Sequence, residues 1–137
     1  MLELSAVTES NIGDDQLSQL TNLRALYLLD NALITDAGLS TLTSLTHLNL
    51  NYNHNTRLTN ASLSCLTALT ELRLEETNCI TDKALEPLSC LRALECGQST
   101  ISRAYRNSLI ERGVHVSDEE NSGWGFETPL DYRWSLS

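Results

Sequence analysis

A leucine pattern of the form L-x-x-L-x-L recurs along this chain about every 22 residues. It begins at Leu23 and returns at Leu45, Leu69 and Leu91, with Cys96 in place of the last leucine of the fourth copy. Regular repeats of this length are typical of solenoids, in which one supersecondary unit stacks on the next. The pattern therefore predicts a stack of similar units.

Counting back from Leu23 places an earlier unit at Met1, with Leu4 and Ala6 aligned to Leu26 and Leu28. About five units then extend to about residue 112. Two extra residues fall in the third unit, inside the segment Asn53-His54-Asn55-Thr56-Arg57. We expect this segment to be a loop, because an insertion in a loop leaves the flanking strand and helix registers intact.

Each unit contains the spacing of one strand and one short helix. Leu26 and Leu28 are two residues apart, which is the periodicity of a strand with both side chains on one face. A second block, I-T-D-x-x-L-x-x-L, follows from Ile34 to Leu42 and predicts a helix. The threonines predicted to be N-caps are Thr35, Thr59 and Thr81. Asp36 and Asp82 suit the positive end of the helix dipole. Strands joined by such helical returns must run parallel, with right-handed connections.

Together these blocks resemble the leucine-rich-repeat family, through the pattern L-x-x-L-x-L-x-x-N-x-x-I-T-D-x-x-L-x-x-L from Leu23 to Leu42. The I-T-D helix start and the near-22-residue period are similar to the family's cysteine-containing subclass. The resemblance implies an α/β fold: a right-handed solenoid of about five β-α coils. It places a parallel sheet on the concave side and helices on the convex side. It also implies that concave side chains bind a protein, and it implies no enzymatic activity.

The chain departs from the family at the position of its Asn, which hydrogen-bonds the backbone of the next coil. Asn31 and Asn53 keep that residue, whereas Glu9, Thr77 and Ser99 stand at the equivalent positions. A hydroxyl can satisfy part of the role of the amide, and a carboxylate cannot donate.

Composition divides the chain into two regions. Residues 1–116 form the predicted solenoid, with units starting near 1, 23, 45, 69 and 91. Its C-terminal cap ends in a short strand, Val114-His115-Val116, beside Leu94. Residues 117–137 form an acidic tail whose aromatic residues are Trp124, Phe126, Tyr132 and Trp134. The sequence leaves open whether this tail is disordered, docks on the solenoid or binds a partner as a short motif.

Strand alternation predicts which side chains point outward from the concave sheet. The candidate partner-binding residues are Tyr27, Leu29, His47, Asn49, Asn51, Tyr52, Arg73, Glu75, Glu76 and Glu95. Tyrosine and arginine are frequent energetic anchors of protein interfaces. The glutamates form an acidic flank, so we expect a partner protein with a basic edge. The alternative is that these polar residues only solvate an open sheet face.

The net charge is −9, with 18 acidic residues against 9 basic ones. Such a surface repels phosphate backbones and anionic lipids, which disfavours nucleic acid and membranes as partners. The charge equally serves to keep a small protein in solution.

Residue types and spacings give no indication of catalysis, of a metal site or of a cofactor. The four cysteines form no C-x-x-C pair, and the three histidines lie outside any nucleophile motif. Reduced cysteines, with no signal peptide and no transmembrane run, indicate an intracellular, cytoplasmic protein. Two structural roles compete with partner binding. The chain is either a terminal unit or fragment of a longer array, or a homodimer that pairs through its uncapped N-terminal coil.

Overall fold

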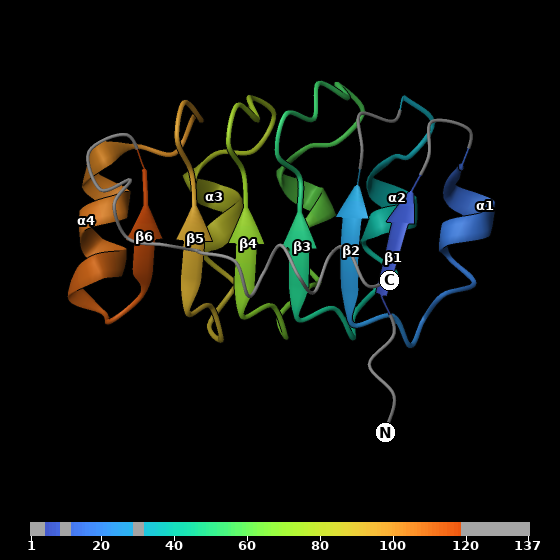
Figure 1. Ribbon diagram of the computed structural model, residues 1–137, viewed down its shortest axis with the longest axis horizontal. Helices are drawn as coiled ribbons and strands as arrows, with labels where there is room; N and C mark the ends of the chain where they lie inside the picture. The colour runs from blue at the N-terminus through green and yellow to red at the C-terminus, as the bar shows by residue number, and fades with distance from the viewer. Residues whose placement is uncertain (1–4, 9–11, 29–31, 119–137) are drawn as a thin grey trace.

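The computed structural model describes the chain at residues 5–8, 12–28 and 32–118, and only the backbone of residues 5–8. Strands and short helices alternate along this part of the chain (Figure 1). The elements are β1 (Ser5–Thr8), α1 (Asp14–Leu17), β2 (Ala25–Leu28), α2 (Asp36–Leu39), β3 (His47–Asn49), the 3-10 helix η1 (Asn60–Ser62), β4 (Glu71–Arg73), α3 (Asp82–Leu85), β5 (Ala93–Glu95), α4 (Arg103–Glu111) and β6 (His115–Ser117).

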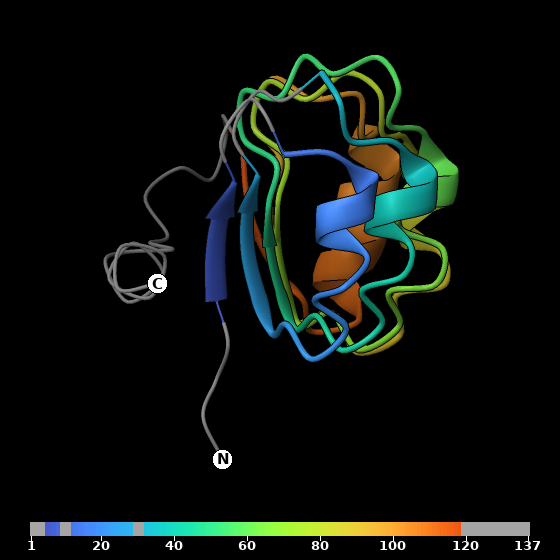
Figure 2. The same cartoon turned by 90° about the vertical axis from the view of Figure 1, so that its right-hand side faces the viewer.

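The described strands form one parallel sheet in chain order from β1 to β6. Figure 2 shows this sheet as one layer and the helices as a second layer beside it, on the right. The predicted C-terminal strand is confirmed as β6, in which Val116 stands opposite Leu94 of β5. The fold is therefore the predicted leucine-rich-repeat solenoid of β-α coils.

The predicted alignment of the first unit is wrong by two residues. Ala6 lies opposite Leu26, where the repeat count placed Leu4. Ile12 still precedes its counterpart Ile34 by one full repeat, so the connection after β1 is shorter than the one after β2. A shift by two keeps the same side chains on the same side of a strand, because alternation has a period of two. Glu9 and Asn31 lie outside the described residues.

A column of leucines fills the space between the sheet and the helices. Leu26, Leu48, Leu72 and Leu94 are each 0% exposed and lie opposite one another on successive strands. Each such side chain contributes about 1.5–3 kcal/mol on burial. The core therefore runs without interruption through the coils, which is why one coil depends on its neighbours.

The helix starts of neighbouring coils are joined by a ladder of side-chain hydrogen bonds on the convex side. The Asp14 carboxylate accepts from the Thr35 N–H at 2.8 Å and from the Thr35 hydroxyl at 2.5 Å. The four rungs run from Asp14 to Thr35, Asp36 to Thr59, Asn60 to Thr81, and Asp82 to Ser102. The aspartates of the I-T-D blocks therefore link coils, beyond any effect on the helix dipole.

Thr35 and Thr59 are confirmed as side-chain N-caps, because each hydroxyl accepts from the N–H two residues later at 3.2 Å. Thr81 stands at the N-cap position but makes no such bond. Its hydroxyl instead accepts from the Asn60 amide at 2.8 Å. In the rung formed by the Asn60 amide, the Thr81 hydroxyl therefore accepts a hydrogen bond from the neighbouring coil. In the carboxylate rungs the hydroxyl donates one instead.

We expect Asn60→Asp to stabilise the protein by about 0.5–1 kcal/mol, since a carboxylate would let the Thr81 hydroxyl donate to it and also cap α3. Urea unfolding followed by circular dichroism measures the change. Asn78→Asp adds the same charge at an exposed position outside the ladder and should leave stability unchanged. An Asn60→Asp variant no more stable than wild type would mean that repulsion from Asp36 and Asp82 cancels the gain.

The residue at the asparagine position of the leucine-rich-repeat pattern hydrogen-bonds the backbone of the preceding coil. The sequence analysis predicted a bond to the next coil. The Asn53 amide donates to the Leu28 carbonyl at 3.4 Å, and the Thr77 hydroxyl donates to the Leu50 carbonyl at 2.6 Å. Threonine therefore takes over the role of asparagine, as predicted. Ser99 does not, because its hydroxyl donates to Cys96 within its own coil.

Candidate functional site

The strand register gathers the predicted outward residues into two columns across the concave face. The first column is Ala25, His47, Glu71, Ala93 and His115. The second is Tyr27, Asn49, Arg73, Glu95 and Ser117. Both alternate with the buried core leucines, so they face away from the helices. Leu29 lies outside the described residues.

Polar side chains of register partners face each other on neighbouring strands. His47 Nε2 lies 3.1 Å from Glu71 Oε2, and Arg73 Nε lies 3.4 Å from Glu95 Oε2. The Thr46 hydroxyl and His47 Nδ1 are also hydrogen-bonded at 2.7 Å. His47 and Arg73 are only 8% and 7% exposed, and Asn49 is buried as well. The sequence predicted the side of the sheet for these residues but not their burial.

The chain bends in the same way after β3, β4 and β5. Tyr52, Glu76 and Gln98 adopt left-handed backbone conformations, with φ of 57°, 54° and 51°. Hydrogen bonds between coils continue through this bend, from the Tyr52 N–H to the Glu75 carbonyl and from the Glu75 N–H to the Asn51 side chain. The predicted residues beyond the strand ends are therefore held in register with those on the strands.

Tyr52, Glu75 and Glu95 interact through their side chains. Burial raises the pKa of Glu95 above its usual value; Arg73 opposes this shift, while the charge of Glu75 and a hydrogen bond with it add to the rise. The charge of Glu75, and a hydrogen bond with it, raise the pKa of Tyr52, which is half-exposed. This end of the face is therefore crowded with negative charge, and a cation would relieve it.

We expect Glu95→Gln to raise the thermal unfolding midpoint at pH 7. The folded-state pKa of Glu95 is raised, so its contribution to stability is fully present below the unfolded pKa and is lost as pH rises through the folded pKa. The neutral amide of glutamine removes that loss of stability. The wild type and the Glu95→Gln variant should therefore converge in stability below about pH 4. Differential scanning calorimetry from pH 3 to pH 8 measures this. Glu86→Gln, at an exposed convex position, is the control. An advantage for Glu95→Gln that grows toward acid pH would contradict the assignment.

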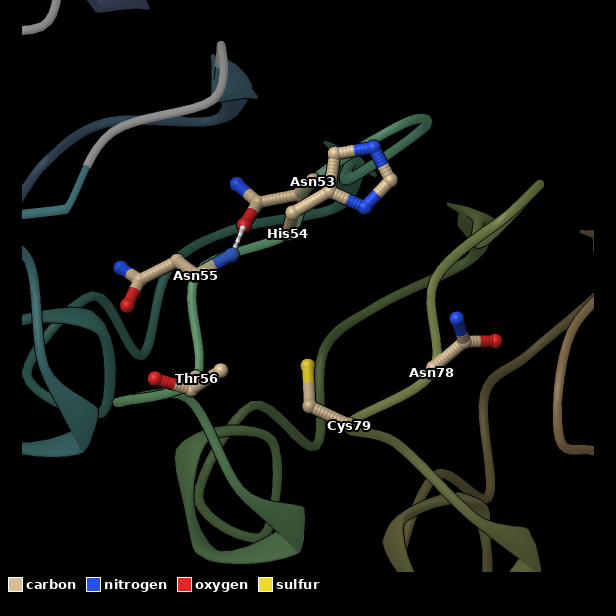
Figure 3. Close-up of a pocket in the computed structure, with 6 residues that line it drawn as sticks. All are labelled: Asn53, His54, Asn55, Thr56, Asn78 and Cys79. Carbon is tan, nitrogen blue, oxygen red and sulfur yellow. Dashed lines mark hydrogen bonds between the residues drawn. The ribbon is translucent and has the colours of Figure 1, made fainter.

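The inserted loop of the third unit forms one wall of a pocket (Figure 3). The pocket has a volume of about 310 Å³ and is lined by Asn53, His54, Asn55, Thr56, Asn78 and Cys79. Burial raises the pKa of Cys79, so the thiol there is un-ionised at neutral pH. Sequence reasoning identified the insertion but not the pocket, because the opposite wall belongs to the next coil.

All four cysteines are free thiols. Cys96 is fully buried, and burial raises its pKa to about 12, as befits a core residue in a leucine position. Among residues 5–8, 12–28 and 32–118, no three His, Cys, Asp or Glu side chains are grouped so as to hold a metal ion. In that same part of the chain, no helix has the length and apolar character needed to cross a membrane.

Comparison with known proteins finds a likeness in structure but no matching sequence family. No family model matches the sequence, and no curated protein matches it. The structure is similar to a chain in the crystal structure of the complex of Rad7 and Elc1 in yeast, with a TM-score of 0.65 and 19% identity. The alignment covers 88% of this chain and 33% of that chain, so this chain spans about a third of the length of its structural relative. At this identity the likeness shows the fold alone.

Proposed function

We propose that this chain is an intracellular protein-interaction module that binds a partner protein through its concave face. The observation that carries the proposal is the register. It brings Tyr27, Asn49, Arg73 and Glu95 into one column, with Tyr52 half-exposed at its border. Tyrosine and arginine are enriched among the residues that dominate binding energies. The similar chain in the Rad7–Elc1 structure belongs to a protein complex, which supports the same role here.

The proposed partner presents a basic edge to this face. Four glutamates of the face, Glu71, Glu75, Glu76 and Glu95, outnumber its one arginine, Arg73, which is already paired. Opposite charge steers association and suppresses wrong partners. The same charge argues against nucleic acid and anionic membranes as ligands.

Affinity capture from lysate of the source cells, with mass-spectrometric identification, tests the proposal. The test variant combines Tyr27→Ala, Tyr52→Ala and Glu76→Lys, which leaves the buried Arg73–Glu95 pair intact. The control combines Gln19→Ala, Thr43→Ala and Glu86→Lys, which makes the same charge change at exposed positions off this face. Circular dichroism establishes that both remain folded.

The proposal predicts a protein captured by wild type and by the control but lost from the test variant. A partner that all three proteins retain equally would exclude the concave face as the binding site.

Self-association is the second candidate. Leu20 is 43% exposed, whereas its counterparts Leu42, Leu66 and Leu88 in later coils are at most 1% exposed. An exposed leucine at a position that is otherwise buried favours contact with another coil. Light scattering after size-exclusion chromatography should then show a dimer that Leu20→Glu dissociates, and a monomer at all concentrations would exclude this role.

A further inference from the structure

The N-terminal coil exposes an apolar side chain at one end of the solenoid. α1 lies at this end and α4 at the opposite end (Figure 1). Leu20 follows α1 and is 43% exposed, whereas Leu42, at the same position of the second coil, is 0% exposed. The second coil has described coils on both sides, and the first coil has one on one side only. The open side of the first coil can therefore accept one more coil.

The opposite end presents a surface that fits this position. Leu109 of α4 takes the place of Leu20 in the fifth coil, since each stands seven residues after the N-cap of its helix. Ile110, the next residue, is 45% exposed. β1 and β6 are the edge strands of the described sheet, and its strands run parallel. A second copy whose β6 pairs with β1 therefore continues the sheet and brings its Ile110 to the side of Leu20.

The charges of the two ends are opposite. Residues 1–22 contain four acidic residues and no lysine or arginine. Residues 91–112 contain four arginines and two glutamates. The difference extends to the ladder of helix starts, because the residue after the N-cap is Asp14 in the first coil and Arg103 in the fifth. Contact between unlike ends is therefore favoured, whereas two N-terminal coils that face each other would repel.

We propose that a second copy of this chain docks its C-terminal coil on the N-terminal coil of the first. In this arrangement Ile110 of the second copy covers Leu20, and its Arg103 lies beside the exposed Asp15. The inference rests on self-association, the second candidate function, and specifies its geometry. A contact between two different surfaces is heterologous, and it grows into an open chain of copies unless its rotation closes a ring. Because only the ends are used, the concave face stays accessible.

Sedimentation velocity from micromolar to millimolar concentration tests this geometry. Leu20→Glu disables the N-terminal surface and Ile110→Glu the C-terminal one, and both positions are exposed, so each variant should stay folded by circular dichroism. We expect the wild type to form dimers and then longer chains as concentration rises, and each variant alone to stay monomeric. An equimolar mixture of the two variants should form a one-to-one dimer and nothing larger, because each supplies the surface that the other lacks.

Charge reversal tests the contact between Arg103 and Asp15. Asp15→Arg or Arg103→Asp alone should weaken self-association roughly tenfold or more, and the double variant should restore it. The matched controls are Glu86→Arg and Lys83→Asp, at exposed positions of the fourth coil, which should associate as the wild type does. A double variant as weak as the single ones would mean that the two side chains do not meet, and would overturn the proposed contact.

Self-association and its geometry can fail separately. A wild type that stays monomeric at every concentration removes both. If Ile110→Glu dimerises as strongly as the wild type while Leu20→Glu does not, two N-terminal coils pair with each other. Self-association then stands, and the contact between unlike ends is excluded.

Discussion

Replacing Gly38 with alanine is expected to destabilise the protein by roughly 2–4 kcal/mol, the range of overpacking combined with a broken, partly buried hydrogen bond. Gly38 lies in α2, and a Cβ atom there would stand 2.2 Å from Asp14 Oδ1 and 3.0 Å from the Asp14 Cα. The carboxylate cannot withdraw without releasing Thr35, which it holds through two hydrogen bonds. In an unconstrained helix, replacing glycine with alanine stabilises the helix by about 0.5–1 kcal/mol. The ladder therefore reverses the sign of the effect on stability.

Urea unfolding of Gly38→Ala measures the effect, with Gly13→Ala as its control. A Cβ atom at Gly13 would meet nothing closer than Gln16 Oε1 at 3.5 Å, and stability should change by less than about 0.5 kcal/mol. A double-mutant cycle with Asp14→Ala isolates the contact, because removing the carboxylate relieves the clash. If the cost of Gly38→Ala were the same with and without Asp14, the clash would not be its cause.

The positions of the strands and of the core leucines could be predicted from the leucine spacing alone. The period-two leucines predicted β2, β3 and β4 and the burial of Leu26, Leu48 and Leu72, because one face of each strand must be covered. The first strand was misaligned by two residues. Repeat counting assumes a constant period, whereas the connection after β1 is shorter and the helix block keeps its own spacing.

Contacts between coils were the part that the sequence did not predict. Asp36 was interpreted as a partner of its own helix dipole, yet its carboxylate binds Thr59 in the following coil. A signal was present, since the Thr-Asp pair recurs with the repeat and such a pair can bond across one period. Recognising it requires knowing that the helix starts stack side by side.

For the candidate site, alternation predicted the column of Tyr27, Asn49, Arg73 and Glu95, and the register agrees. It could not predict that Arg73 is buried against Glu95 or that Glu75 interacts with Tyr52, because these depend on side-chain conformation across strands. Whether these residues bind a partner stays a prediction.

Replacing Asn55 with alanine should cost roughly 2–4 kcal/mol, although this residue belongs to a loop insertion. Asn55 is 4% exposed, and its side-chain amide donates to the Ile34 carbonyl of the preceding coil at 2.6 Å. Its side-chain oxygen accepts from the Arg57 N–H at 2.8 Å. Alanine leaves both of these backbone groups without this partner, and an unsatisfied group that is buried, as the Ile34 carbonyl is, costs about 1–3 kcal/mol. Calorimetric and urea unfolding measure the loss.

Thr56→Ala is the control, because Thr56 is the exposed neighbour in the same loop and should change stability by less than about 0.5 kcal/mol. Hydrogen exchange locates the effect. The loss of Asn55 should accelerate exchange of the Arg57 amide, whose side-chain acceptor it removes, and leave amides of β5 little changed below the global transition. Unchanged stability together with an unchanged exchange rate would mean that water replaces both bonds. The insertion would then be an ordinary surface loop, and the wall of the pocket beside His54 would not depend on Asn55.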